Sequence, residues 1–204
     1  MILEAKNIGF RYRNSEYIIK NVDFKISSNE RVGIVGRSGY GKTTFGKILA
    51  GYLKPNWGEL LLNNKEIPVK GFNPVQLINQ HAEKSINPRW KMKKAINENV
   101  IVYAELLEIL GIRETWLDRY PNELSGGELQ RFAIARSITN ETNFIVADEI
   151  TAMHDGITQA QIWKSLIDIS EKRNIGLIII THNKELANRV CTRIVNLEEI
   201  NNII

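Results

Sequence analysis

The sequence has almost no cysteine and no long apolar stretch. Cys191 is the single cysteine among 204 residues, which excludes a disulfide framework and a cysteine-rich metal site. No apolar run approaches the ~18 residues that a membrane-spanning helix requires. The N-terminal stretch MILEAKNIGF lacks the basic and apolar regions of a signal peptide. From these absences we expect a soluble intracellular protein.

The chain also lacks a strong excess of charge. Lys and Arg number 27 against 23 Asp and Glu, which gives a formal net charge of +4 at pH 7. This small excess permits anionic ligands, but the basic residues are scattered and form no cluster of the kind that binds nucleic acid. We therefore expect no nucleic-acid partner. Without internal repeats or low-complexity segments, the chain fits one domain, or a domain with an inserted subdomain.

Short strands dominate the first third of the chain. Residues 2–12 and 18–26 alternate apolar and polar side chains, which is typical of half-buried antiparallel strands. Residues 31–36 form an apolar run that ends in glycine and predict a buried strand. Residues 42–51 then predict a helix, and residues 58–67 predict another strand.

The pattern becomes helical in the middle and alternates afterwards. Residues 99–111 and 127–138 have helical spacing, so we expect a helical subdomain there. Residues 144–149 and 176–182 are apolar strands, with a predicted helix over 158–173 between them. Strand, helix and strand with fully apolar strands predict a parallel sheet covered on both faces. Chemistry in such sheets takes place beyond the carboxyl ends of the strands.

The segment GRSGYGKTT, residues 36–44, matches the phosphate-loop pattern G-x-x-x-x-G-K-[ST] in full. It lies between a predicted strand and a predicted helix, which is the context that the motif requires. Its glycines let backbone N–H groups wrap a phosphate, Lys42 reaches the outer phosphates, and the Thr43 hydroxyl can bind Mg²⁺. The alternative is a glycine-rich turn with a surface lysine. The candidate phosphate-binding residues in this loop are Gly36, Arg37, Ser38, Gly39, Gly41, Lys42, Thr43 and Thr44.

Polar residues follow three other apolar runs. Asp148 ends a predicted strand, where it can hold the water shell of Mg²⁺, and Glu149 can act as general base on the attacking water. His182 can hydrogen-bond a γ-phosphate and orient that water. Gln80 can ligate Mg²⁺ and sense the γ-phosphate, and Tyr12 can stack on an adenine ring. The alternatives are a carboxylate pair that caps a turn, a structural histidine and a core tyrosine, and the glutamine alone says almost nothing.

The segment ELSGGELQR, residues 123–131, places two glycines directly before a predicted helix. The first N–H groups of a helix have no internal partner and carry partial positive charge. The small residues Gly126 and Gly127 let an anion approach these groups closely. A plain loop in which Ser125 caps the helix explains the segment about as well.

Together these motifs resemble the ABC-type ATPase domain. A phosphate loop, a glutamine, L-S-G-G-E, apolar-D-E and T-H follow in that order, and the resemblance covers essentially the whole chain. It implies an α/β fold, a P-loop NTPase with a RecA-like parallel sheet core, an N-terminal antiparallel β subdomain and an inserted α-helical subdomain. It also implies a single domain over 1–204, in which 1–80 and 141–204 form the β subdomain and core and 81–140 the helical subdomain.

The resemblance also implies roles for individual residues. The loop of Ser125, Gly126 and Gly127 presses on the γ-phosphate that a second ATPase subunit holds in a head-to-tail dimer. Tyr12 takes the adenine-stacking position, and Asp155 lies in the loop that crosses between subunits. The implied catalytic residues are Glu149 and His182, the implied Mg²⁺ ligands are Thr43, Gln80 and Asp148, and the implied cofactors are ATP and Mg²⁺.

A narrower resemblance is to the ATPases of peptide and nickel importers. QHAEKSINPR, YPNELSGGELQR and DGITQAQI are similar to that group's versions of these segments. The resemblance implies a peripheral protein on the cytoplasmic face of the cell membrane that works with two transmembrane permease subunits. An extracytoplasmic substrate-binding protein would deliver peptide, nickel or a similar substrate. The second ATPase subunit is a related chain or another copy, and we expect residues 80–90 to receive the permease's coupling helix.

Three positions depart from the family pattern. Glu128 replaces the usual glutamine, Ile150 the usual proline and His154 the usual leucine, and we expect activity to survive these changes. One alternative is a soluble ABC-type ATPase acting on nucleic acid or ribosomes, but those proteins usually have two fused domains or long coiled-coil insertions. Another is a subunit that binds ATP without hydrolysing it, but such subunits commonly lose one of Glu149 and His182.

Overall fold

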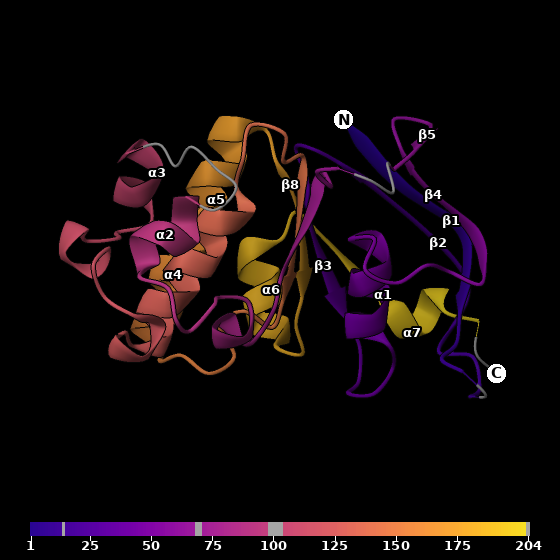
Figure 1. Cartoon of the computed structure of the whole chain (residues 1–204). Helices are drawn as coiled ribbons and strands as arrows, with labels where there is room; N and C mark the ends of the chain where they lie inside the picture. The colour runs from indigo at the N-terminus through magenta and orange to yellow at the C-terminus, as the bar shows by residue number, and fades with distance from the viewer. Residues whose placement is uncertain (14, 68–70, 98–103, 203–204) are drawn as a thin grey trace.

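The computed structural model describes residues 1–13, 15–67, 71–97 and 104–202. It contains two β-sheets and a group of helices that lies to one side of them (Figure 1). Among the described residues, no helix is both long and apolar enough to cross a membrane.

The first sheet is antiparallel and has the strand order β2-β1-β4-β5. Its strands are β1 (Ile2–Phe10), β2 (Ile19–Ser27), β4 (Trp57–Leu62) and β5 (Lys65–Glu66). Leu3 pairs with Ile26 on one side and with Leu62 on the other. The predicted strand over 58–67 is thus a hairpin, whose turn residues Asn63 and Asn64 both have positive φ, as tight hairpin turns require.

The second sheet is parallel and has the strand order β6-β7-β8-β3-β9. Its strands are β6 (Val75–Ile78), β7 (Phe144–Asp148), β8 (Gly176–Ile180), β3 (Arg31–Val35) and β9 (Arg193–Asn196). Every residue of β7 and β8 is buried. Continuous burial explains why both strands are apolar throughout, because a central parallel strand is covered on both faces.

Two hydrophobic cores lie on opposite faces of the parallel sheet. Val146 and Ile178 point towards α1 (Lys42–Leu49) and the antiparallel sheet. Figure 1 accordingly shows α1 between the two sheets. Alternate residues of the same strands, Ile145 and Leu177, contribute to the core on the other face. The helices on that face include α4 (Gly126–Ser137), α5 (Gly156–Arg173) and α6 (Lys184–Val190).

The helical region contains α2 (Met92–Asn97), α3 (Ala104–Ile109) and α4, with short 3₁₀ turns at Ala82–Lys84, Glu114–Trp116 and Pro121–Glu123. Met92, Leu106 and Phe132 are its fully buried anchors. Within the described residues, no strand lies between β6 and β7. The helix predicted over 99–111 is observed as α3, and its first part, 99–103, lies outside the described residues.

The C-terminal part of the chain forms three elements that were not predicted from the sequence. They are α6, the edge strand β9 and the four-residue helix α7 (Leu197–Ile200). Leu197 is fully buried and packs in the core that contains α1. Figure 1 shows α7 beside α1, on the side of the parallel sheet that faces the antiparallel sheet.

Candidate nucleotide site

A cavity of about 410 Å³ lies at the carboxyl ends of β3, β7 and β8. Parallel strands bring their carboxyl ends to one edge of the sheet, so loops far apart in sequence meet there. Most of the residues predicted to bind nucleotide or act on it line this cavity. They are Ser38, Gly39, Gly41, Lys42, Thr43, Thr44, Gln80, Asp148, Glu149 and His182.

The phosphate loop holds its shape through glycines with positive φ. Gly39 has φ 84° and Gly41 has φ 86°, which side-chain-bearing residues rarely adopt. A Cβ atom on Gly41 would lie 2.7 Å from a methyl carbon of Ile18, whereas one on Gly39 would meet open space. Gly41 is the N-cap of α1 and supplies no side-chain cap. The first N–H groups of α1 are therefore left for an anion.

The ammonium group of Lys42 is folded into the phosphate loop. Its Nζ donates hydrogen bonds to the carbonyl oxygens of Gly36 at 2.7 Å and of Arg37 at 2.9 Å, and the residue is only 8% exposed. A cation this well buried needs anionic or polar partners. Two carbonyls satisfy part of that need, so phosphate oxygens entering the loop would be favourable partners for the same group.

Asp148 is a buried carboxylate with an unused oxygen. Its Oδ1 atom has no hydrogen-bond partner, and Thr43 hydrogen-bonds to its side chain. Burial raises the pKa of Asp148, and the neighbouring Glu149 carboxylate raises it further. An unpartnered buried carboxylate oxygen beside a hydroxyl fits Mg²⁺, which takes one or two carboxylates together with phosphates and water. Gln80, the third predicted ligand, lines the same cavity.

No acidic or histidine-rich cage surrounds that position. Within the described part of the chain, no group of three or more His, Cys, Asp and Glu residues could hold a metal ion. Thr43, Asp148 and Gln80 would hold Mg²⁺ only together with the nucleotide. When bound, Mg²⁺ would neutralise charge on the phosphate oxygens.

Glu149 is held in a strained backbone conformation beside His182. Its φ is 52°, in the left-handed region that a glutamate rarely adopts. The Glu149 N–H donates to the carbonyl oxygen of Ile180 at 3.0 Å. Its Oε1 accepts from the backbone N–H of His182 at 2.9 Å and lies 2.6 Å from His182 Nδ1. Sequence reasoning placed both side chains in the site but did not anticipate that they would bond to each other.

Three residues of the predicted set line neither this cavity nor the one at the S-G-G loop. Tyr12 is 44% exposed, and its ring contacts Phe10 edge-to-face with centroids 5.0 Å apart. Gly36 lies at the base of the phosphate loop. The guanidinium group of Arg37 bonds to Glu198, a residue for which no role was predicted.

The S-G-G loop lines a second cavity, of about 500 Å³. Its walls include the remaining predicted residues Ser125, Gly126, Gly127 and Asp155. Gln80 lines both this cavity and the one at the phosphate loop. The two glycine-rich loops of one chain thus face different spaces, which are separated at Gln80.

The chain itself already uses several groups of the S-G-G loop. Ser125 Oγ accepts from the N–H of Glu128, whose carboxylate accepts from the N–H of Ser125 at 2.8 Å, so the two residues form a capping box. A Cβ on Gly127 would lie 2.6 Å from a methyl carbon of Thr158. Packing against Thr158 therefore explains why residue 127 is a glycine. Asp155 caps α5 by accepting from the N–H groups of Ile157 and Thr158, both at 3.0 Å.

The other two departures from the family pattern, Ile150 and His154, lie in different surroundings. Ile150 is 1% exposed and belongs to the core that contains α4 and α5. The ring of His154 lies against Gly126, 3.4 Å from the position of a Cβ there. Burial lowers the pKa of His154, while Asp155 acts in the opposite direction.

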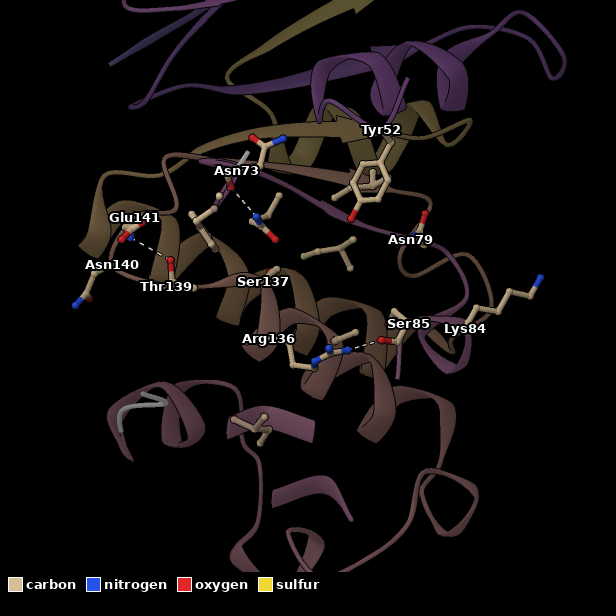
Figure 2. Close-up of a pocket in the computed structure, with 17 residues that line it drawn as sticks. Tyr52, Asn73, Asn79, Lys84, Ser85, Arg136, Ser137, Thr139, Asn140 and Glu141 are labelled. Atoms are coloured by element: carbon tan, nitrogen blue, oxygen red, sulfur yellow. Dashed lines mark hydrogen bonds between the residues drawn. The ribbon is translucent and has the colours of Figure 1, made fainter. Parts of the chain in front are cut away.

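A larger cavity, of about 1020 Å³, lies between β6 and α4 and was not anticipated from the sequence. Figure 2 shows Tyr52 and Asn79 on one side of it and Arg136 on the other. The Arg136 guanidinium donates to the carbonyl oxygen of Ser85 across one end. This cavity contains none of the predicted catalytic residues.

Comparisons with known proteins agree with this arrangement. The family model described as ABC transporter matches residues 19–152. The chain is 32% identical over 190 residues to the probable D,D-dipeptide transport ATP-binding protein DdpF of Escherichia coli (strain K12), covering 87% of this chain and 60% of that protein. It is 29% identical to the nickel import system ATP-binding protein NikE of Staphylococcus aureus (strain bovine RF122 / ET3-1), over 97% of this chain and 87% of that protein.

A third relative is the methionine import ATP-binding protein MetN of Helicobacter acinonychis (strain Sheeba), which is 33% identical over 94% of this chain and 64% of its own length. The chain thus spans less than two thirds of DdpF and MetN.

Solved structures agree as well. The dimeric structure of MJ0796, a bacterial ABC transporter cassette, has a TM-score of 0.80 at 26% identity, over 95% of this chain and 93% of that one. The same cassette in a post-hydrolysis state bound to ADP and Pi gives the same values. The expected P-loop NTPase fold, with its parallel core, antiparallel β subdomain and helical insertion, is confirmed. The chain belongs to the ABC transporter family and is an ATPase domain of that family.

Proposed function

We propose that the chain is the ATP-hydrolysing subunit of an importer that takes up peptide, nickel or a similar small substrate. The observation that carries this proposal is the 410 Å³ cavity, which gathers the phosphate loop, Asp148, Glu149 and His182. The three relatives are all named as transport or import proteins. Those names favour an importer over a soluble ATPase acting on nucleic acid or ribosomes.

The geometry suggests how these residues would hydrolyse ATP. The free N–H groups of the phosphate loop and the ammonium of Lys42 bind the phosphates. Glu149 takes a proton from water as the water oxygen bonds to the γ-phosphorus, and the bond from that phosphorus to the β,γ-bridging oxygen breaks. His182 Nδ1, 2.6 Å from Glu149 Oε1, keeps the carboxylate oriented. The His182 side chain is 68% exposed, so its ring can also meet an incoming γ-phosphate.

Two ATPase subunits would complete each site. The Ser125–Gly127 loop faces a cavity other than the one at its own phosphate loop. In the proposed head-to-tail pair, each ATP lies between the phosphate loop of one subunit and the S-G-G loop of the other. The solved MJ0796 cassette is dimeric, which supports this arrangement. The partner is a related chain or a second copy.

The cavity between β6 and α4 is the proposed seat of a permease subunit (Figure 2). Lys84 and Ser85, from the segment 80–90 expected to receive the coupling helix, line it. Ile86 is only 3% exposed and belongs to the core beneath. A cysteine at the exposed Lys84 should therefore crosslink to a cytoplasmic loop of the permease, and one at Asn63 in the distant hairpin should not.

In this proposal, the ATPase pair lies on the cytoplasmic face of the membrane beneath two permease subunits. An extracytoplasmic substrate-binding protein delivers the substrate. The named substrates of the relatives are D,D-dipeptide, nickel and methionine, so the proposed substrate class is a small polar solute of this kind.

The test of the proposed function uses Glu149→Gln, which keeps the shape of the site but cannot accept the proton of water. The variant, mixed with its partner ATPase if there is one, should sediment as a dimer with ATP and as monomers with ADP. Adding Gly126→Asp should abolish the ATP-driven dimer, because a carboxylate would meet the γ-phosphate at short range. An aspartate is tolerated in the first turn of a helix, so the second change should leave α4 folded.

Two outcomes would contradict the head-to-tail arrangement. One is a double variant that still dimerises with ATP. The other is a Gly126→Asp single variant that no longer binds ATP, since this loop would then serve the nucleotide of its own subunit. A wild-type chain that binds no nucleotide would contradict the proposed function as a whole.

A further inference from the structure

The short helix α7 holds the first residues of the phosphate loop. Glu198 Oε1 accepts a hydrogen bond from the backbone N–H of Arg37 at 2.6 Å, and Oε2 accepts from Arg37 Nε at 2.9 Å. The Glu198 side chain is 20% exposed, whereas that of Arg37 is 72% exposed. The hydrogen bonds from Arg37 lower the pKa of Glu198, with a smaller contribution from the charge of Lys42.

The base of the loop touches the same helix. A Cβ atom on Gly36 would lie 3.6 Å from both Glu198 Oε1 and Asn196 Oδ1. Asn196 is the N-cap of α7 and accepts from the N–H of Glu198 at 3.2 Å. The first two residues of the phosphate loop therefore rest on the start of α7.

The other end of α7 reaches the far end of the phosphate loop through β2. Asn201 Nδ2 donates to the carbonyl oxygen of Ile18 at 2.8 Å, and Asn201 Oδ1 accepts from the N–H of Lys20 at 2.8 Å. Asn201 is only 6% exposed. Ile18 packs against Gly41, leaving no room for a Cβ atom there, and Ile18 also lines the nucleotide cavity.

We propose that α7 is a brace that fixes both ends of the phosphate loop, with Glu198 and Asn201 as positioning residues for nucleotide binding. The inference rests on the proposed function, because it concerns the binding of ATP at that loop. Loop N–H groups that are held in place before binding need no ordering when the phosphates arrive. Loss of the brace should therefore weaken binding without altering the groups that act on water.

The negative charge of Glu198 should weaken the binding of an anionic ligand, whereas its hydrogen bonds to Arg37 should strengthen it. A carboxylate near the phosphate loop repels an anionic ligand, so a role through charge alone predicts tighter binding once the charge is removed. The brace predicts weaker binding once the hydrogen-bond acceptor is removed. Glu198→Gln separates the two effects, because the glutamine carbonyl oxygen can still accept from the N–H of Arg37 while the charge is lost.

The experiment measures the affinity of the full chain for ATP and for inorganic tripolyphosphate by isothermal titration. Glu198→Ala should bind both ligands about tenfold more weakly, as expected for losing a hydrogen bond to a charged group. Glu198→Gln should stay within about threefold of wild type, since it keeps the bond to the loop backbone. Glu199→Ala is the matched control, because Glu199 is exposed and, among the described residues, its carboxylate bonds to Asn196 and not to the phosphate loop.

Two further measurements separate positioning from general destabilisation. Steady-state ATPase assays of Glu198→Ala should show a raised KM and a kcat within about twofold of wild type, since Glu149 and His182 are untouched. Asn201→Ala, compared with wild type below its own melting temperature, should weaken the binding of both ligands as well. This result would show that the second arm of the brace acts on the same loop.

Several outcomes would overturn the brace. Equal affinity in wild type and Glu198→Ala would remove any role for α7 in binding. Tighter binding in both Glu198 variants would mean that the carboxylate acts only as a charge. If the wild-type chain binds nucleotide but the Glu199→Ala control weakens as much as Glu198→Ala, the effect belongs to the helix in general. A wild-type chain that binds no nucleotide fails earlier, at the proposed function.

Discussion

The chain has two glycine-rich loops that each lead into a helix, and they leave their helix N-termini in different states. At α1 the N-cap is Gly41, which supplies no side-chain cap. At α4 the N-cap is Ser125, which forms a full capping box with Glu128. The phosphate loop therefore leaves all the first N–H groups of its helix for a ligand, whereas the S-G-G loop has already satisfied part of its own.

A glycine motif in the sequence does not by itself show whether the N–H groups of the following helix are free. Gly41 has a left-handed backbone. A Cβ atom there would also clash with Ile18, so the position favours glycine for two reasons. In the S-G-G loop, a Cβ on Gly127 would clash with Thr158, whereas one on Gly126 would lie 3.4 Å from the ring of His154. Two glycine-rich loops can thus look alike in sequence while one leaves its helix N-terminus open and the other packs against its own chain.

The strongest loss of activity is expected at Glu149, which lies in neither glycine-rich loop. Glu149→Gln should lower kcat by about 10²–10⁴-fold, the usual loss when a general base is removed. ATP should still bind, because neither glycine-rich loop is changed. Single-turnover hydrolysis and nucleotide titration on the same variant check this. A variant that hydrolyses ATP at the wild-type rate would show that another group accepts the proton.

The next effect tests the phosphate loop alone. Lys42→Ala should weaken ATP binding by about ten- to a hundredfold, because a charge-assisted contact with phosphate is lost. Titration with a fluorescent ATP analogue measures it. Lys47→Ala, a change in the last turn of the same helix, is the control and should bind normally. Unchanged affinity in Lys42→Ala would place the nucleotide elsewhere.

The next prediction compares the free energy of unfolding of two variants, each with one glycine of one loop replaced by alanine. Gly41→Ala should lower the free energy of unfolding by at least ~1–2 kcal/mol, because alanine is strained in a left-handed conformation and its Cβ would meet Ile18. Gly126→Ala should change it by no more than about 0.5–1 kcal/mol, in the stabilising direction, because Gly126 lies in the first turn of α4. Urea denaturation of both variants gives the comparison, and equal losses would contradict it.

The smallest expected effects are changes in melting temperature when Asp148, in the phosphate-loop cavity, or Asp155, in the S-G-G cavity, is replaced. Burial raises the pKa of Asp148 in the folded chain above its value in the unfolded chain. As pH rises, the unfolded chain therefore loses this proton first. The free energy of unfolding falls until the folded chain is ionised as well. Asp148→Asn should raise the melting temperature at pH 7 by on the order of a few degrees. The gain should vanish at a pH below the ordinary range of an aspartate, where both states are protonated.

Asp155 should behave in the opposite way. Its bonds with Thr158, from the hydroxyl first and then the backbone N–H, lower its pKa, so its stabilising effect is present at neutral pH and lost as pH falls through the folded-state pKa. Asp155→Ala should lower the melting temperature at pH 7 and change it little in strong acid. Melting curves of both variants across pH test the pair, and parallel behaviour would contradict the contrast.

Much of the fold and site could be predicted from contiguous patterns. The strands over 31–36, 144–149 and 176–182 were recognisable as apolar runs, and the phosphate loop as a spacing of glycines and a lysine. The meeting of the residues after those strands in one cavity followed from the rules of parallel sheets. Each of these features is encoded within about ten neighbouring residues.

What the sequence did not predict depends on pairs that are far apart in the chain. The bond between Glu149 and His182 joins two strand ends 33 residues apart, and no local pattern records it. The contact between Arg37 and Glu198 spans 161 residues and involves a helix of four residues, too short to show a helical period. The cavity between β6 and α4 draws its walls from residues between Tyr52 and Glu141.

The backbone of Glu149 has a consequence for how this protein would evolve. A left-handed glutamate costs about 1–2 kcal/mol that a glycine at the same position would not. A single substitution to glycine would therefore remove the proposed general base and relieve backbone strain at once. Glycine would also lose the hydrogen bonds that the Glu149 carboxylate makes with His182. The glutamate is thus kept against the preference of its own backbone, and its bonds to His182 offset part of that cost.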